Sequence, residues 1–263
     1  MTARITLIPC LLLLSISSSL CAAPEFQCDF DGYTANEPLM ESQGAQKIWK
    51  TQSQDPAQGI YSVVRQDTEH HFSSSSFKKM LEISDISREN NVFFRLWPYS
   101  VDVGEAGFVR CTFADPRDAP HQGGGFILRI SQSPGNRNTA FALSIQNGNL
   151  IPCSSKAVEP NGDTVASYRL DQAHELVIVF NNSQSDISYS AGNLPPQTMD
   201  VWLDQKRVAQ AITACGGLGA GEPIRSFDFT SKSKPDPELD FVGTLLIGEV
   251  SMGSLKNLPP LGS

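Results

Sequence analysis

The chain has 263 residues, of which 28 are acidic and 20 are basic, so its formal net charge is −8 at pH 7. An acidic chain without a block of lysine or arginine is a poor candidate for binding nucleic acid or an anionic membrane. Beyond its first residues it holds no apolar run long enough for a membrane span. We therefore expect a globular chain whose partner is neither a nucleic acid nor a lipid bilayer.

The first 23 residues predict a secretory signal peptide. Arg4 supplies its positive charge, Ile5–Leu14 is an apolar core too short to serve as a membrane helix, and Ser15–Ala23 is small and polar. A lipid anchor on Cys21 is not expected, because a leucine precedes it where lipoprotein signals have a small residue. Residues 24–263 are then expected to form one domain that is secreted, either extracellular or periplasmic.

Short alternating or apolar runs recur along this domain, separated by clusters of Gly, Pro, Asn and Asp, and this pattern is typical of an antiparallel β-sandwich. Convincing amphipathic helices are missing, and a helical turn is expected only around Ile86–Asn90. Strands are predicted near Gln27–Phe30, Ile60–Arg65, Lys79–Ile83, Asn91–Trp97, Gly107–Phe113, Gly125–Ser131, Ala140–Gln146, Ser167–Leu170, Glu175–Asn181, Thr198–Leu203, Ile224–Thr230 and Thr244–Met252.

The first predicted strand follows the signal peptide directly, and the last lies near the end of the chain. Jelly-roll sandwiches often pair their terminal strands, so we expect the two ends of this domain to be neighbours. Near the middle, two strong strand patterns between Tyr168 and Gln210 flank a polar connection, and Asp204–Arg207 is expected to form a polar turn after the second.

Two segments of the domain carry a family resemblance: Asp29–Tyr33, with Gly44 and Trp49 after it, and Phe241–Val250 at the other end. The first resembles the opening, and the second the final strand, of concanavalin A-like, or laminin G-like, jelly rolls of secreted bacterial proteins.

The stretch Tyr168–Val208 resembles a hallmark of the same family, in which Trp-His precedes an apolar strand and Asp-Gly forms a later turn. In this chain His174 follows Ala173 instead of tryptophan, and Gln205 stands where glycine is usual. The resemblance covers the whole domain and implies an all-β fold, an antiparallel two-sheet sandwich of the jelly-roll type.

Alternation along four strands between Phe93 and Gln146 places the apolar side chains on one face and a polar stripe on the other. If these strands are neighbours, the stripe lies on the concave sheet of the jelly roll. Guanidinium groups there would suit carboxylates or sulfates, and an indole would suit the apolar face of a sugar. Alternatively, each arginine is a solvated residue with a local acidic partner. The predicted ligand-binding residues are Arg95, Trp97, Arg110, Arg129, Ser144 and Gln146.

The same face could carry a polysaccharide lyase, which on this fold needs a cation or amide to neutralise a uronate carboxylate and a tyrosine or histidine for proton transfer. Arg129 is a candidate for neutralisation, and His121 or Tyr99 for the base, with His121 preferred because imidazole titrates near neutrality. A glycoside hydrolase is less expected, because Glu238–Asp240 begins like its paired-glutamate motif but the second glutamate is missing.

Asp29, Asp31 and Asp240 come from segments that are expected to meet at the terminal strands, where relatives of this fold often hold a structural Ca²⁺. The alternative is that these are ordinary surface acids. No cofactor is required by any motif in the chain.

Four cysteines remain after the signal peptide, and four cysteines allow three disulfide connectivities. Export would permit disulfides, whereas buried free thiols are the alternative. The cysteines are Cys28, Cys111, Cys153 and Cys215.

The leading hypothesis is a secreted jelly-roll domain that binds a polysaccharide, with an anionic one favoured by the arginines. The second is a lyase that acts on a glycan containing uronic acid. The third is a structural or adhesive surface domain with a protein partner, for which an exposed apolar patch would argue. The sequence leaves the three open, and it leaves the oligomeric state open as well.

Overall fold

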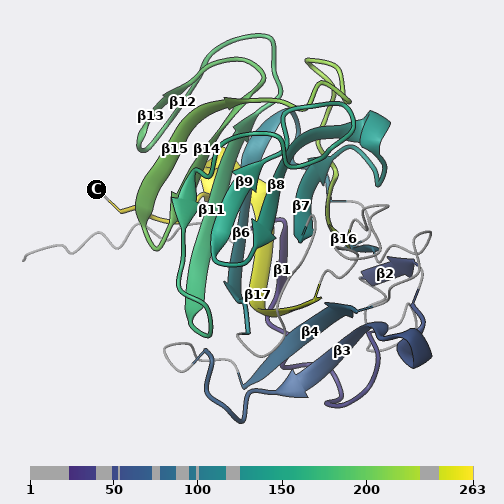
Figure 1. The fold of residues 1–263 in the computed structure, drawn as a ribbon. Coiled ribbons are helices and arrows are strands. Elements are labelled where there is room, and N and C mark those ends of the chain that lie inside the picture. Colours follow the sequence, from purple (N-terminus) through teal and green to yellow (C-terminus); the bar gives the residue numbers. More distant parts are fainter. Residues whose placement is uncertain are drawn as a thin grey trace, which may run out of the picture.

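The computed structural model describes residues 24–39, 49–52, 54–72, 78–86, 95–98, 101–116, 125–231 and 243–262. Two large antiparallel sheets pack face to face and form a sandwich (Figure 1). This confirms the predicted all-β, two-sheet fold. The predicted signal peptide and Cys21 lie outside the described residues. No helix within the described ranges is long and apolar enough to cross a membrane.

Eight strands form the first sheet, in the order β15-β14-β11-β6-β17-β4-β3, with β1 paired to β17. The strands are β1 (Phe26–Cys28), β3 (Ile60–Gln66), β4 (Lys79–Asp85), β6 (Ala106–Ala114), β11 (Ala173–Asn181), β14 (Thr198–Leu203), β15 (Lys206–Thr213) and β17 (Gly243–Ser254).

Seven strands form the second sheet, in the order β10-β9-β8-β7-β16-β5-β2. The strands are β2 (Trp49–Gln52), β5 (Arg95–Pro98), β7 (Phe126–Ser131), β8 (Thr139–Gln146), β9 (Asn149–Pro152), β10 (Ala166–Ser167) and β16 (Ser226–Ser231). A separate hairpin and three short 3₁₀ turns complete the described structure: β12 (Ile187–Tyr189), β13 (Gly192–Leu194), η1 (Pro56–Gln58), η2 (Asn136–Asn138) and η3 (Leu255–Asn257).

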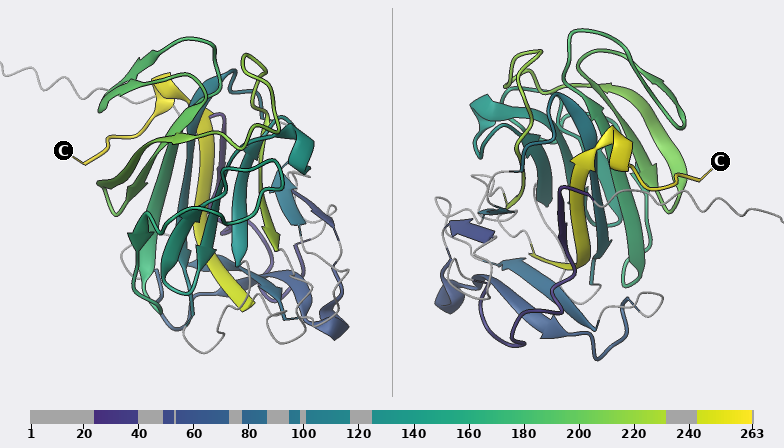
Figure 2. Two further views of the ribbon diagram at one scale, coloured as in Figure 1. Left: turned by 45° about the horizontal axis from the view of Figure 1, so that its top comes forward. Right: turned by 180° about the vertical axis from the view of Figure 1, so that it is seen from behind.

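The first and last strands are neighbours, as predicted. Phe26 lies opposite Met252 and Cys28 lies opposite Val250 in an antiparallel pair. The views in Figure 2 show β1 running alongside β17. Because β17 also pairs with β6 on its other edge, the terminal strands are built into the middle of the eight-stranded sheet.

The core lies between the two sheets and follows the predicted alternation. Aromatic side chains such as Phe113, Phe141 and Phe180 are fully buried there. Burial of a side chain of this size stabilises the fold by about 1.5–3 kcal/mol. Three further apolar clusters lie outside this core. Those around Trp202 and around Cys153 lie on the outer faces of the two sheets, so the hairpin and loops cover parts of both faces.

The turn after β14 is shorter than the predicted Asp204–Arg207. Asp204 and Gln205 alone form it, with φ values of 49° and 65°, while Lys206 already pairs with Leu203 in β15. Two successive left-handed residues make the two-residue hairpin turn whose twist matches that of the flanking strands. The usual glycine is absent, and the Asp204 carboxylate stabilises the turn by accepting hydrogen bonds from the Glu175 amide at 2.9 Å and from His174, whose Nδ1 is 2.7 Å away.

Candidate functional site

Five of the six residues of the predicted stripe lie on one face of the seven-stranded sheet. Arg95 and Trp97 lie on β5, Arg129 lies on β7 and Gln146 lies on β8, all in the seven-stranded sheet. Their chain neighbours Leu96, Leu128 and Ile145 belong to the core. Side chains alternate along a strand, so these four residues point to the face that turns away from the core, which we call the outer face. Ser144 on β8 shares this face.

Arg110 does not belong to this face, and its place in the predicted stripe is wrong. It lies on β6, which pairs with β11 and β17 in the eight-stranded sheet. There its Nε donates to Glu175 Oε2 at 2.7 Å, and its Nη1 lies 4.0 Å from Glu249. The chain passes from one sheet to the other between β6 and β7, so consecutive strands are not neighbours at this point.

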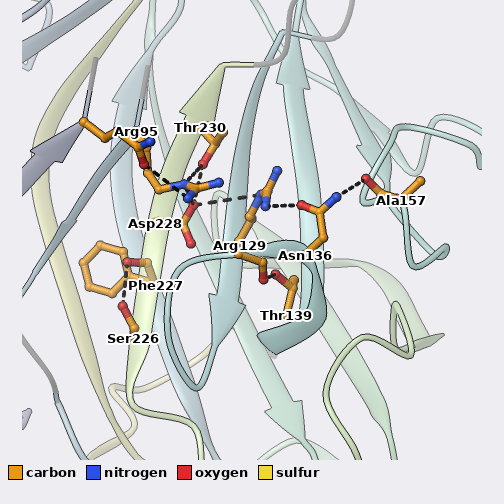
Figure 3. A network of polar contacts seen from close by, with 11 residues as sticks. Arg95, Arg129, Asn136, Thr139, Ala157, Ser226, Phe227, Asp228 and Thr230 are labelled. Atoms are coloured by element: carbon orange, nitrogen blue, oxygen red, sulfur yellow. Dashed lines mark hydrogen bonds and ion pairs between the residues drawn. The ribbon is translucent and has the colours of Figure 1, made fainter. Parts of the chain in front are cut away.

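A residue that the sequence reasoning missed, Asp228, lies at the centre of the outer face (Figure 3). It is on β16, between β5 and β7, and it lies directly opposite Arg129. The Asp228 carboxylate is 3.6 Å from Arg95 Nε and 3.9 Å from Arg129 Nε. The alternation Phe227-Asp228-Phe229-Thr230 could have shown that Asp228 points away from the core. We call Arg95, Asp228, Arg129 and Thr230 the arginine–aspartate cluster.

Hydrogen bonds hold this cluster in place. The Thr230 hydroxyl donates to Asp228 Oδ1, and Arg95 Nε is 3.4 Å from the same hydroxyl oxygen. Arg129 Nη1 donates to Asn136 Oδ1 at 2.7 Å, and Asn136 Nδ2 donates in turn to the Ala157 carbonyl at 2.9 Å. The guanidinium of Arg129 is thereby tied to the segment that follows β9.

The electrostatics of the cluster are dominated by burial. The side chain of Asp228 is 0% exposed. Within the described part of the chain, its Oδ2 accepts no hydrogen bond and the buried Nε of Arg129 donates none. Burial raises the pKa of Asp228, although Arg129, the Thr230 hydrogen bond and Arg95 act against this shift. Burial also lowers the pKa of Arg129, against the attraction of Asp228. Desolvation outweighs the attraction because neither ion pair reaches the distance of about 2.7–2.9 Å of a charge-assisted hydrogen bond.

The accessible part of the outer face is at the β5–β2 end. The side chain of Arg95 is 13% exposed, and Trp97 is half-buried. Across the strand pair, Gln52 lies opposite Arg95 and Lys50 lies opposite Trp97. Arg95 Nη1 is 3.5 Å from Gln52 Oε1. This end therefore places a guanidinium, an indole, an ammonium and an amide on two neighbouring strands.

The β7–β8 end is covered. Ile127, Ala142, Cys153, Val158 and Cys215 form an apolar cluster on this part of the outer face. Two predicted ligand-binding residues are buried at this end, since Arg129 is 3% exposed and Ser144 is 0% exposed. Both can position other groups, but in this conformation neither reaches a ligand from solvent.

The remaining predicted site residues divide into two groups. Tyr99, His121 and Asp240 lie outside the described residues, so the predicted base and one predicted metal ligand stay predictions. Asp31 is described, and its Oδ1 accepts from the amides of Lys78 and Lys79 at 2.9 and 3.0 Å.

An ammonium group sits beside the predicted calcium ligands. Lys79 Nζ donates to the carbonyl oxygens of Asp31 at 2.8 Å and Tyr33 at 2.6 Å, which are oxygens of the kind that Ca²⁺ uses. Asp29 Oδ1 accepts from the Asp31 amide at 3.1 Å. Among the described residues no group of three His, Cys, Asp or Glu is arranged to hold a metal ion.

His174 forms a second polar arrangement beside a cavity of about 390 Å³. Its Nδ1 lies 2.7 Å from Asp204 Oδ2, and its Nε2 lies 2.9 Å from the Arg169 carbonyl oxygen. Next to it, the buried Tyr168 hydroxyl donates to Asp115 at 2.7 Å. Both ring nitrogens of His174 are engaged with the chain, so this residue ties the β14–β15 turn to β11.

The protein is thus a two-sheet jelly roll in which a buried acid, Asp228, lies between two arginines on one outer face. No family model matches the sequence, and no curated protein matches it.

Solved structures share the fold. One is the conserved carbohydrate esterase of the Shiga toxin-encoding bacteriophage phi24B, with 14% identity, a TM-score of 0.50, and coverage of 88% of this chain and 97% of the other. A second is a mutant of the alginate lyase Aly36B in complex with alginate tetrasaccharide, with 10% identity, a TM-score of 0.52, and coverage of 89% and 98%. A third is the Crh5 transglycosylase, with 10% identity, a TM-score of 0.50, and coverage of 89% and 85%. At these identities the likeness shows a shared fold alone.

Proposed function

We propose that this protein binds an acidic polysaccharide through the outer face of the seven-stranded sheet, at the β5–β2 end. The observation that carries the proposal is the placement of Arg95 and Trp97 on the same face, two residues apart and both partly accessible. A guanidinium can bind a carboxylate or sulfate with paired hydrogen bonds, and an indole can lie against the apolar face of a sugar ring.

Local charge supports an anionic ligand. The whole chain carries a net charge of −8, yet Arg95 and Arg129 flank Asp228 on this face, and Lys50 lies opposite Trp97 on the neighbouring strand. Burial raises the pKa of Asp228, although Arg129, the Thr230 hydrogen bond and Arg95 act against this shift. A locally positive surface attracts anionic ligands even when the whole protein is acidic.

The fold supports a carbohydrate partner. The proteins of known structure that share it include an alginate lyase seen with an alginate tetrasaccharide and an esterase described as acting on carbohydrate. We carry over the class of partner from these structures and not their reactions or their residues.

The test is a binding assay against uronate-containing, sulfated and neutral polysaccharides. We expect binding to uronate or sulfated chains, and a loss of affinity of about 10- to 100-fold in Arg95→Gln, which corresponds to about 1.4–2.8 kcal/mol. Trp97→Ala is expected to weaken binding as well. Arg110→Gln is the matched control, because Arg110 lies on the other sheet. Equal affinity in Arg95→Gln and Arg110→Gln would refute the proposed face, and no binding to any acidic chain would refute the proposed function.

The lyase hypothesis is tested by the same incubations. A lyase leaves an unsaturated uronate that absorbs in the ultraviolet, whereas a binding protein leaves the polysaccharide intact. Substitution of His121 or Tyr99, the two candidates for its base, should abolish this absorbance if the substituted residue is the base. An adhesive domain with a protein partner has less support, because Ile86 is the single exposed large apolar side chain in the described part of the chain.

A further inference from the structure

Two of the four cysteines meet on the outer face of the seven-stranded sheet. Cys153 follows β9 and Cys215 follows β15, and both belong to the apolar cluster that covers β7 and β8. The Cys215 thiol donates to the Cys153 carbonyl with a sulfur–oxygen distance of 2.6 Å. Residues 62 positions apart in the chain are thus brought into direct contact.

The backbone spacing of this pair suits a disulfide. The amide of Cys153 donates to the Ala142 carbonyl at 3.0 Å, and the amide of Cys215 donates to the Ala140 carbonyl at 2.7 Å. These two carbonyls lie two residues apart on one edge of β8, which corresponds to about 6.6 Å along the strand. Disulfides join residues whose Cα atoms are about 4.4–6.8 Å apart. The spacing of the two segments along β8 thus falls at the upper end of the range that a disulfide spans.

The other pairings are excluded by the sheet. Cys28 on β1 and Cys111 on β6 both lie opposite Val250 of β17, one on each side. Their separation is two interstrand spacings, about 9.6 Å, and this exceeds the reach of a disulfide, about 7 Å. A mixed pair is also excluded, because Cys28 and Cys111 lie in the core between the sheets while Cys153 and Cys215 lie on the outer face.

We infer that Cys153 and Cys215 are a disulfide-forming pair, whereas Cys28 and Cys111 remain thiols. All four are buried, and none of these four is joined in a disulfide in this structure. In the oxidation, each of the two thiols loses its proton, a sulfur–sulfur bond forms, and the two electrons pass to a disulfide oxidant such as oxidised glutathione, which becomes two thiols. The inference does not depend on the proposed function.

Oxidation would fasten the two segments that cover Arg129. Asn136, which accepts from Arg129, is bound to Ala157 in the segment after Cys153. On the other side, the Leu218 amide, three residues after Cys215, donates to the Thr139 carbonyl at 3.0 Å. A covalent link between the two segments would hold this cover over the buried end of the arginine–aspartate cluster.

The burial of the pair determines when the bond forms. Burial raises the pKa of the Cys215 thiol to about 12, and thiolates rather than thiols attack disulfides. The folded, reduced protein is therefore expected to oxidise slowly, and the bond is expected to form during folding.

The test is differential labelling of the full chain after refolding. The protein is unfolded under reducing conditions and refolded in a buffer of reduced and oxidised glutathione. Free thiols are then alkylated, disulfides are reduced, the released thiols receive a second label, and each cysteine is read by peptide mass spectrometry. We expect the second label on Cys153 and Cys215, the first label on Cys28 and Cys111, and a cross-linked peptide before reduction. The oxidised protein should also unfold about 5–15 °C above the reduced one.

Two variants sharpen the result. Cys153→Ser should move Cys215 to the first label, whereas the matched control Cys28→Ser should leave the Cys153–Cys215 peptide in place. The first label on both Cys153 and Cys215 in refolded protein would overturn the inference. A cross-link from either of them to Cys28 or Cys111 would overturn it as well.

Discussion

Replacing Asp228 with asparagine tests the electrostatics of the arginine–aspartate cluster. Asparagine keeps the shape of the side chain and still accepts from the Thr230 hydroxyl, but it carries no charge and does not titrate. The variant therefore removes one buried ionisable group and leaves its neighbours Arg95 and Arg129 in place. The quantity of interest is the free energy of unfolding of the wild type minus that of Asp228→Asn, as a function of pH.

The sign of the pH dependence follows from the burial. Burial raises the pKa of Asp228 above its ordinary value of 3.8, so between these two values the folded state holds a proton that the unfolded state has lost. Stability falls as pH rises wherever the folded state binds more protons. The difference should therefore decrease from about pH 4 upward, by at most about 1.4 kcal/mol per pH unit for one group, and become constant above the folded-state pKa.

Urea unfolding at several pH values between about 4.5 and 7.5 measures this difference, and urea is preferred to guanidinium salts because it leaves charges unscreened. The matched control is Asp102→Asn, which removes a carboxylate that is 64% exposed and 3.7 Å from Arg225. A surface pair of this kind contributes about 0–1 kcal/mol. A difference that increases with pH would refute the reasoning, because the two arginines would then outweigh the burial of Asp228.

Three further results are expected. Asn181→Ala should lower the free energy of unfolding by about 2–4 kcal/mol in urea, because this buried amide donates through Nδ2 to carbonyl oxygens of the connection around β12 and β13 and accepts through Oδ1 from Ser183; a loss below about 1 kcal/mol would contradict it. Tyr168→Phe should cost about 1.5–3 kcal/mol in the same assay, because it removes the donor to the buried Asp115 carboxylate; an unchanged midpoint would show that the bond is not needed. Addition of Ca²⁺ or a chelator should leave the thermal midpoint unchanged, because the Lys79 ammonium already binds the carbonyls of Asp31 and Tyr33; a rise with Ca²⁺ would restore the calcium hypothesis.

The face of each side chain could be predicted from the sequence because alternation is a local property of a strand. Arg95 and Arg129 were placed away from the core, and their neighbours Leu96 and Leu128 are in it. The pairing of the terminal strands was predicted too, through the jelly-roll resemblance, and β1 does pair with β17. Strand existence was easiest to predict where β-branched and aromatic residues alternate, as in Thr198–Leu203.

The sheet to which each strand belongs could not be predicted in the same way. Arg110 has the same local pattern as Arg129, yet β6 and β7 lie in different sheets. Pairing is decided by contacts between residues far apart in the chain, and neither alternation nor spacing carries that information. For the same reason Asp228 was missed, because it reaches Arg129 from nearly 100 residues away.

Five strands escaped prediction because their sequences carry weak strand signals. β12 and β13 lie in a connection rich in Asn, Ser, Gly and Pro, which reads as a loop, and β2 and β9 have only four residues each. β15 begins at Lys206 with charged residues, and the turn before it lacks the glycine that is typical of a two-residue hairpin turn. This turn is stabilised instead by hydrogen bonds from residues distant in the chain, such as that between His174 and Asp204.

The cover over the outer face changes which residues can reach a ligand. Taken strand by strand, Arg95, Arg129 and Ser144 were equivalent members of a polar stripe, but the segments after β9 and β15 bury the last two. Under the proposed function, Arg129 acts on a ligand only through the charge and position of Asp228 and Arg95. Substitution of Arg129 should consequently change stability more than affinity, whereas substitution of Arg95 should change affinity more than stability. Since these segments already bury Arg129 in a structure without a Cys153–Cys215 bond, the difference between the two arginines should persist when that bond is reduced, and urea unfolding together with the polysaccharide-binding assay, each carried out with and without reductant, measures it.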